Sequence, residues 1–380
     1  MPHRQPIQKI TRADGTLRYR IKVDAGTHLS GKRRQITRTY RTYKQAEQAL
    51  AQIRTDVSRG DFIARQNVDV ATYFASWLAG KRNIRATTRT QYADVSRQFL
   101  DKYGTLPLQH LTKAHMDDAV TDLLTTGGKH GTGRGPSYVK AFLVAWGQAL
   151  DVAVKEGYMR ANPARMTERP GLPLPKPLTW TPAQAEMFIA GVQEHPWEAL
   201  WHLTMAGLRR GEVMGLVWEN VNLDSESLLI DRARVLVNGK VEPSGTKTRK
   251  GTRTLPLWAD LTAVLRSLKL RQSQERLACG GWESTLLAVD AEGTPIYPRS
   301  YADEFKTISA DLGLPIIPLK NARHTSVTLM RDRGIPDHIV AAWHGHDETV
   351  MRNYYTAAQD APMRLAAESI QTRFRRNGES

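Results

Sequence analysis

The sequence predicts a multidomain α+β protein with a small β-sheet-plus-helix domain, a helical domain, and a mixed, mainly α-helical domain. Its 380 residues exceed the size of one ordinary domain. The hydrophobic pattern changes along the chain from strand-like alternation to helical spacing. A proline-rich stretch, RPGLPLPKP, then separates two long folded regions. The predicted boundaries are residues 1–62, 68–166 and 178–380 for the three domains and 167–177 for the linker.

The first domain is predicted as extended runs covered by one helix. In the run at residues 17–23, cationic and apolar residues alternate. Arg18, Arg20 and Lys22 therefore share one face of the strand, and the apolar residues share the other. A capping signal at Thr42 then opens a helix whose apolar stripe can cover the sheet. The basic face can contact a DNA groove or can be a solvated charged face, and the alternation alone leaves both open.

The second domain is predicted to be a helical bundle. Apolar residues at helical spacing begin one helix near Phe74 and another near Tyr92, and Thr112 opens a third. A glycine-rich basic loop at residues 127–135 precedes a long helix over residues 137–156. Each of these helices needs a partner to bury its apolar stripe, so the pattern favours a bundle.

Four cations gather where the second helix of this bundle is expected to begin. They are Lys81, Arg82, Arg85 and Arg89. The backbone amides of a helix N-terminus also attract phosphate, so the cluster predicts contact with a nucleic-acid backbone. A solvated face is the alternative for any one of these cations.

The third domain mixes helices with a few strands. Thr181 and Pro182 signal the start of its first helix, and a second helix is expected over residues 197–206. Asn238-Gly239 signals a hairpin between two extended runs. The other predicted elements are strands over residues 228–237 and 253–257 and helices over residues 258–278, 322–333 and 362–373.

Five residues of the third domain form a set that can cleave a phosphodiester. A scissile phosphate gathers negative charge as its phosphorus is attacked, and the guanidinium groups of Arg209 and Arg323 can clamp its non-bridging oxygens. Lys247 can protonate the leaving oxygen, and His346 can donate to the phosphate or shuttle a proton. Tyr355 can attack, but a phenol has a pKa of about 10, so cationic neighbours must ease its ionisation.

Four fragments carry these residues in order: AGLRRGE, GTKTRKGTRTLPL, LKNARHT and WHGHDETVMRNYY. They resemble the catalytic boxes of the tyrosine recombinases, and the whole-chain layout resembles a phage-type or integrative-element integrase. The resemblance implies that Glu212, one helical turn after Arg209, orients that arginine. It implies catalytic roles for Arg209, Lys247, Lys320, Arg323, His346 and Tyr355.

The sequence departs from the family pattern at two positions. Lys320 stands where the family usually has a histidine, and both a phosphate contact and proton transfer stay open for it. His344 stands where leucine is usual, and it is interpreted as a packing residue or a solvent-exposed one. Tyr355 follows His346 at the spacing of the family nucleophile, although chemistry alone does not separate it from Tyr354.

The resemblance also implies a layout and a reaction. The first domain is expected to bind arm-type DNA, the second to be a SAM-like core-binding domain, and the third to be the DNA breaking-rejoining catalytic domain. The protein is expected to integrate or excise a phage or mobile element through a 3′-phosphotyrosine intermediate. The expected partners are double-stranded DNA with core-type and arm-type attachment sites, further copies in a homotetramer, a DNA-bending host factor and an excision directionality factor.

Neither a metal nor another cofactor is expected, because arginines supply the positive charge and no C-x-x-C or H-E-x-x-H spacing is present. The net charge of +16 and the pI near 10.0 favour a polyanionic partner. The single cysteine, Cys279, suits a reducing cytosol. No transmembrane run or signal-peptide core is found, so we expect a cytoplasmic, nucleoid-associated protein of a bacterial host with no membrane partner.

Two alternative functions stay open. A type IB topoisomerase would use the same chemistry to relax supercoils without choosing sites. A catalytically silent DNA-binding regulator would rely on the first domain alone. The helix expected over residues 362–373 also has two interpretations, since it can pack against its own protomer or against a neighbouring one.

Overall fold

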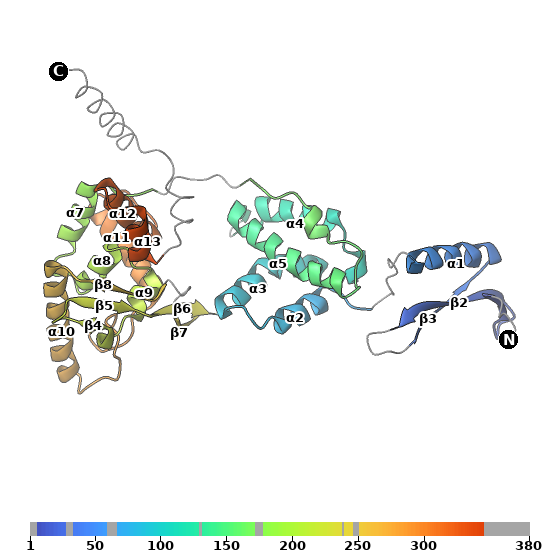
Figure 1. Ribbon diagram of the computed structural model, residues 1–380, viewed down its shortest axis with the longest axis horizontal. Coiled ribbons are helices and arrows are strands. Elements are labelled where there is room, and N and C mark those ends of the chain that lie inside the picture. The colour runs from blue at the N-terminus through green and yellow to red at the C-terminus, as the bar shows by residue number, and fades with distance from the viewer. Residues whose placement is uncertain are drawn as a thin grey trace, which may run out of the picture. The chain divides into compact units, whose positions relative to one another are not determined.

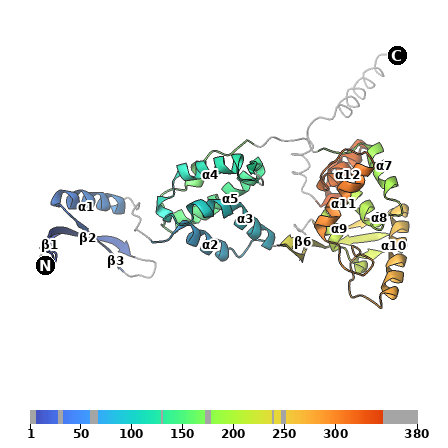
Figure 2. The ribbon, with the colours of Figure 1, turned by 180° about the vertical axis from the view of Figure 1, so that it is seen from behind.

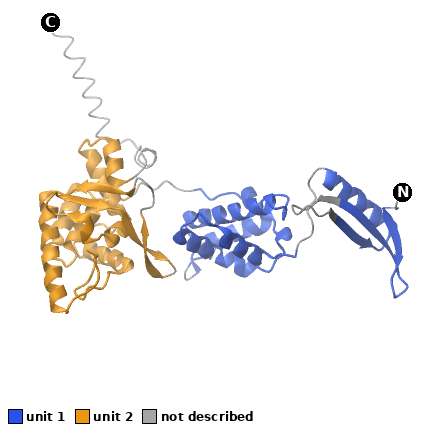
Figure 3. Ribbon diagram, turned by 60° about the horizontal axis from the view of Figure 1, so that its bottom comes forward, with its two compact units in different colours: residues 1–172 blue, residues 173–380 orange. Residues whose placement is uncertain are grey.

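The computed structural model describes residues 6–27, 33–58, 67–128, 131–171, 178–237, 239–245 and 251–345. The predicted site residues Lys247, His346 and Tyr355 lie outside these ranges, as does Tyr354. The chain divides into two compact units, residues 1–172 and 173–380 (Figure 3). The finer domain boundaries stay a prediction.

The N-terminal part folds as a three-stranded antiparallel sheet covered by one helix (Figure 1). Its elements are β1 (Ile7–Thr11), β2 (Leu17–Thr27), β3 (Arg33–Tyr40) and α1 (Tyr43–Ser58). Ile21 of β2 lies opposite Ile7 of β1 and is fully buried, and it belongs to one core with the buried Leu50 and Ile53 of α1. Period-two alternation therefore places the apolar residues of β2 under the helix, as the sequence predicts.

A helical bundle follows, with a hydrophobic core of its own. Its elements are α2 (Val70–Gly80), α3 (Ala86–Tyr103), the 3₁₀ turn η1 (Leu108–His110), α4 (Lys113–Thr125), α5 (Pro136–Lys155) and the short α6 (Pro163–Met166). Asp69 caps α2 by accepting the Thr72 amide at 2.7 Å. Phe74 of α2 stacks on Trp146 of α5 with ring centroids 4.5 Å apart, so these two helices are joined through aromatic rings.

The second unit, residues 173–380, contains the predicted catalytic residues and is named the catalytic unit for them. Its helices are α7 (Pro182–Gly191), α8 (Glu198–Met205), α9 (Arg210–Gly215), α10 (Ala259–Ala278), α11 (Pro298–Asp311), α12 (Lys320–Asp332) and α13 (Asp337–His344). Its strands are β4 (Val221–Asn222), β5 (Ser227–Ile230), β6 (Arg232–Val237), β7 (Lys240–Gly245) and β8 (Arg253–Pro256), and a 3₁₀ turn, η3 (Trp218–Asn220), precedes β4. The order in one sheet is β4-β5-β8, while β6 and β7 form a separate hairpin that projects from the helices of this unit (Figure 2).

The predicted single strand over residues 228–237 is wrong, because the chain breaks into β5 and β6 at Asp231. The Asp231 carboxylate accepts hydrogen bonds from Asn220 Nδ2 at 2.7 Å and from Arg232 Nε at 2.9 Å. These side-chain bonds hold the residue between the strands, so β5 pairs with β8 and β6 pairs with β7. The break directs the hairpin away from the sheet.

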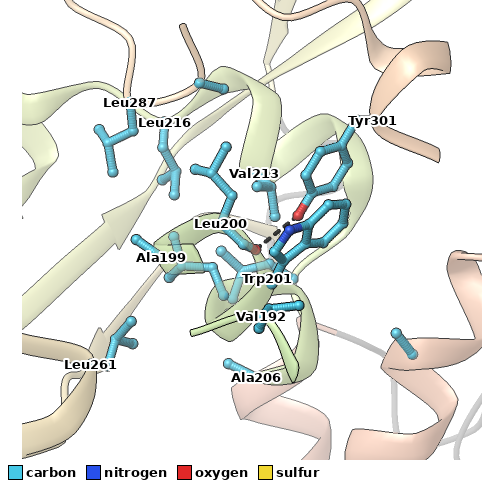
Figure 4. Close-up of a cluster of buried hydrophobic side chains, with 14 of the residues drawn as sticks. Val192, Ala199, Leu200, Trp201, Ala206, Val213, Leu216, Leu261, Leu287 and Tyr301 are labelled. Carbon is cyan, nitrogen blue, oxygen red and sulfur yellow. Dashed lines mark hydrogen bonds between the residues drawn. The ribbon is translucent and has the colours of Figure 1, made fainter. Parts of the chain in front are cut away.

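The core of the catalytic unit is built on large aromatic rings. Trp201 of α8 and Tyr301 of α11 stack nearly in parallel, with centroids 4.1 Å apart, and both are fully buried (Figure 4). The Tyr301 hydroxyl donates to the Leu200 carbonyl oxygen at 2.9 Å. This packing fixes α8, whose C-terminal end leads directly into the first predicted catalytic box. In the described part of the chain, no helix is long and apolar enough to cross a membrane.

Candidate active site

Arg209 is positioned by the tight turn between α8 and α9. Gly207 in this turn has φ = +92°, a conformation that favours glycine, and Arg209 is the N-cap of α9. The Arg209 amide donates to Glu212 Oε2 at 2.9 Å, and its Nη1 donates to Glu212 Oε1 at 2.6 Å. The structure thus brings the first predicted arginine and its predicted orienting carboxylate into direct contact.

Glu212 also binds a second arginine, Arg253 of β8. Arg253 Nη2 lies 3.0 Å from Glu212 Oε2, and its Nη1 lies 3.3 Å from Oε1. Burial by itself would raise the pKa of Glu212, but the hydrogen bond and charge of Arg253 and the charge of Arg209 outweigh it and hold the pKa below its ordinary value. Glu212 is therefore a buried carboxylate that stays ionised between two cations.

Arg323 lies on α12 and is only 7% exposed. Its Nη1 donates to the Gly207 carbonyl oxygen at 2.6 Å, and its Nη2 donates to the carbonyl oxygen of His344. The α8–α9 turn and the end of α13 therefore meet at this guanidinium. Arg209, which lies in that turn, also binds the end of α13, through the Gly345 carbonyl oxygen, so both predicted clamp arginines meet there.

The C-terminus of α13 is held by three arginines. Its last carbonyls have no partner within the helix and carry partial negative charge, so they attract cations. Gly345 ends the helix in a left-handed conformation, φ = +59°. The Trp343 carbonyl oxygen accepts from Arg253 Nε at 2.6 Å. The His344 carbonyl oxygen accepts from Arg323 Nη2, and the Gly345 carbonyl oxygen accepts from Arg209 Nη2 at 3.3 Å.

His344 is a packing residue, which decides between its two interpretations. Its ring is fully buried and lies against Gly207, where a Cβ would be 2.4 Å from His344 Nε2. Nδ1 lies 2.8 Å from the Val340 carbonyl oxygen, which only accepts, so Nδ1 carries the proton. Nε2 then accepts from Ser326 Oγ at 3.1 Å. Trp343 of α13 also binds the end of α8, since its Nε1 donates to the Ala206 carbonyl oxygen at 2.8 Å.

Lys320 and His324 occupy the first turn of α12. Lys320 is exposed and begins the helix, one turn before Arg323. His324 is half-buried; burial, followed by the charges of Lys320 and Arg323, lowers its pKa. A neutral imidazole at His324 is the consequence near neutral pH.

The predicted DNA contacts of the first domain share one face of β2. Arg20 and Lys22 are exposed, and Arg18 is half-buried with its Nη1 3.1 Å from the Leu17 carbonyl oxygen. These three residues alternate with Ile21 and Val23, which are buried beneath α1. The face thus exists as predicted, and its contact with DNA stays a prediction.

The cation cluster of the bundle divides into two kinds of residue. Arg82 and Arg85 are exposed. Lys81 lies 4.9 Å from the centroid of the Trp77 ring, and its Nζ donates to Gln148 at 3.2 Å. The Arg89 guanidinium donates to the carbonyl oxygens of Leu78 and Lys81 at the end of α2, so it holds two helices together.

Sequence reasoning missed the roles of Gly207, Arg253 and Trp343. Arg253 lies within a fragment that carried the resemblance, but its partners Glu212 and Trp343 are 41 and 90 residues away along the chain. Its place in that fragment was a sequence signal, but a cation at the start of a strand is ordinarily a solvated residue, so the fragment did not predict these contacts.

The amino-acid sequence of this chain is similar to those of known proteins. The model of the phage integrase family matches residues 198–361, which include both clamp arginines and the predicted nucleophile. A "Tyrosine recombinase XerC-like" protein of Caldanaerobacter subterraneus subsp. tengcongensis is 23% identical over 94% of this chain and 96% of its own length. An integrase of Streptomyces ambofaciens is 26% identical over 93% of this chain and 94% of its own length.

Solved structures agree at the level of the fold. The Tn1549 transposon integrase, in complex with transposon right end DNA, matches 80% of this chain and 100% of that chain, with 17% identity and a TM-score of 0.65. A lambda integrase tetramer bound to a Holliday junction matches 95% of this chain and 99% of that chain, with 13% identity and a TM-score of 0.57. These two structures show the fold. The family model covers the part of the chain that holds Arg209, Glu212 and Arg323, and with the relatives of similar length it identifies a tyrosine recombinase of the phage integrase type, an enzyme that cleaves and rejoins DNA.

Proposed function

We propose that this site-specific recombinase is the integrase of a phage or integrative element and acts at attachment sites. The observation that carries the proposal is the convergence of Arg209 and Arg323 on the end of α13, the segment that leads into His346. The two guanidinium groups are permanently cationic, and the chain continues from this helix end toward the predicted nucleophile. Such cations favour attack on a phosphodiester because they stabilise the negative charge that develops on it.

The arginines are proposed to clamp the scissile phosphate. Charge develops on the non-bridging oxygens as the phosphorus is attacked, and a guanidinium presents several donors in a fixed plane. The Arg209 side chain is 33% exposed, which leaves part of its fork accessible to DNA, and Glu212 sets its orientation. Lys320, exposed one turn before Arg323, is proposed to add a further phosphate contact.

Lys247, His346 and Tyr355 complete the proposed reaction. The Tyr355 phenol gives its proton to solvent water and its oxygen attacks phosphorus, which forms a 3′-phosphotyrosine bond and breaks the bond to the 5′-oxygen. Lys247 gives a proton to that leaving oxygen, and His346 donates a hydrogen bond to the phosphate. Attack of a 5′-hydroxyl on the phosphotyrosine reverses these steps and rejoins DNA, so the exchange conserves bond energy and needs no ATP.

The assembly is proposed to be a homotetramer on double-stranded DNA. Lambda integrase is a tetramer when bound to a Holliday junction, and its chain is covered nearly completely by this one, which supports the analogy. We propose that the β1–β3 sheet binds arm-type sites and that the bundle and catalytic unit bind core-type sites. A DNA-bending host factor, an excision directionality factor and a nucleoid location in a bacterial cytoplasm belong to the same proposal.

Plasmids that carry or lack the cognate site test the proposal. We expect recombination and a covalent protein–DNA adduct only with the site-bearing plasmid. Relaxation of both plasmids at equal rates would instead support a type IB topoisomerase, and absence of any adduct would support a silent DNA-binding regulator. Tyr355→Phe should abolish the adduct and Tyr354→Phe should retain it; the reverse result would move the nucleophile to Tyr354.

A further inference from the structure

Arg253 joins three segments of the catalytic unit through one buried guanidinium. Its side chain is 7% exposed. The guanidinium group donates two hydrogen bonds to the Glu212 carboxylate, at 3.0 and 3.3 Å. Its Nε donates to the Trp343 carbonyl oxygen at 2.6 Å, and its Nη1 also donates to the Gly251 carbonyl oxygen at 3.0 Å. The strand β8, the helix α9 and the C-terminus of α13 are thereby linked at a single residue.

Only an arginine can make this set of contacts. A guanidinium carries five N–H donors in a fixed plane, so it can serve a carboxylate and two carbonyl groups at once. A lysine ammonium at the same place keeps the charge, but a single nitrogen cannot span Glu212 and Trp343 with the same geometry. Substitution of Arg253 by lysine therefore keeps the positive charge and removes the planar set of donors.

The contacts of Arg253 lead to the groups assigned to the phosphate. Glu212 holds Arg209 with bonds of 2.6 and 2.9 Å on its other side. The Trp343 carbonyl is the first of the three consecutive carbonyls that the arginines bind, and that run ends at Gly345, immediately before His346. A displaced Arg253 would remove one of the two arginines that hold the carboxylate and one of the three that hold the helix end.

We propose that Arg253 is a positioning residue for strand cleavage, which fixes Arg209 through Glu212 and fixes the α13 C-terminus through Trp343. The proposal rests on the proposed function, since the groups it positions are those assigned to the scissile phosphate. Arg253 itself does not touch the phosphate. Its loss affects the geometry of the clamp and leaves the DNA-binding surfaces intact.

The experiment compares Arg253→Lys and Arg253→Gln with Arg266→Gln in the full chain. Arg266 is an exposed arginine that also donates to a backbone carbonyl, Leu223 O at 3.0 Å, which makes it a matched control. Single-turnover cleavage and core-site affinity are measured on one nicked substrate. We expect a loss of about 10- to 100-fold in cleavage rate for both Arg253 variants, the usual cost of removing a group that orients a reacting one, with unchanged affinity. Arg266→Gln should cleave normally.

A second substrate tests whether the defect lies in the clamp. A methylphosphonate at the scissile position carries less negative charge, so its cleavage depends less on well-placed arginines. The cleavage defect of the Arg253 variants should shrink on this substrate. Normal cleavage by Arg253→Lys, or an equal defect on both substrates, would overturn the inference.

Folding and function are separated within the same experiment. Arg253→Gln leaves the buried Glu212 with one cation fewer, so this variant is at risk of misfolding. Arg253→Lys keeps the positive charge. If the glutamine variant does not fold, the cleavage rate of the lysine variant tests the positioning role. Failure of the wild-type protein to cleave its site would overturn the proposed function. Cleavage by the wild-type protein together with normal cleavage by Arg253→Lys would overturn the positioning role alone.

Discussion

The cations of the β1–β3 sheet and the arginines of the catalytic unit carry the same charge in opposite surroundings. Arg20 and Lys22 lie exposed on a strand, whereas Arg253 and Arg323 are nearly buried and bind carbonyl or carboxylate oxygens from distant segments. An exposed cation is screened by salt and acts almost independently of its neighbours. A buried one belongs to a network in which removal of one partner leaves another unsatisfied. The first region should therefore respond gradually to mutation, and the second abruptly.

Removal of a clamp arginine is the strongest test of this contrast. We expect Arg209→Ala and Arg323→Ala each to lower the rate of strand cleavage by about 10³- to 10⁵-fold, as the loss of a cation does in related phosphoryl transfers. Single-turnover cleavage of a nicked core substrate measures the effect, and Arg266→Ala is the control. A near-normal rate in either clamp variant would contradict its assignment.

Gly207→Ala should disturb the same site through shape alone. The backbone strain at φ = +92° costs about 1–3 kcal/mol, and the new Cβ would also lie 2.4 Å from His344 Nε2 and 2.9 Å from Ser326 Oγ. Gly334→Ala is the matched control, because φ is +78° there and no atom lies within 4 Å of the Cβ. Denaturant unfolding should show the larger loss of stability at Gly207, and equal losses would refute the close packing against His344.

Acid should weaken the catalytic unit through Glu212. Its pKa is held below the ordinary value of 4.5, so ionised Glu212 contributes stability that is fully present above that value and is lost as the pH falls through the folded-state pKa. Glu212→Gln should lower stability at neutral pH and flatten its acid dependence. Unfolding measured across the acid range checks this, with the exposed Glu292→Gln as control. An unchanged acid dependence in Glu212→Gln would contradict the interpretation.

The smallest effects are expected on the sheet. Replacement of Arg20 or Lys22 by alanine should weaken arm-site binding and reduce the salt slope of its affinity by about one unit per cation, because each neutralised phosphate releases about one counterion. Lys9→Ala is the control: Lys9 pairs with Tyr19, so it lies on the opposite face of the same sheet. Titration at several salt concentrations measures the slope. Equal changes in the salt slope for the Lys9 and Arg20 variants would mean that arm-site DNA does not bind the Arg20 face in preference to the opposite one.

Local patterns were sufficient for much of this protein. The alternation in β2 predicts which residues α1 covers, and helical spacing predicts the bundle, because both periodicities are properties of the backbone itself. The chemistry of the catalytic boxes is also local: Arg209 and Glu212 are one helical turn apart, and the structure shows them in contact. The roles of Lys247, His346 and Tyr355 stay predictions, because these residues lie outside the described ranges.

What only the tertiary structure decided is where each buried polar group finds its partner. Arg209 meets Gly345 across 136 residues, and Arg323 meets Gly207 across 116. His344 could be interpreted as packed or exposed until α12 and the α8–α9 turn were seen to enclose it. A sequence pattern records how residues follow one another along a strand or helix, whereas a buried arginine is satisfied by oxygens that folding brings together from segments far apart in the chain.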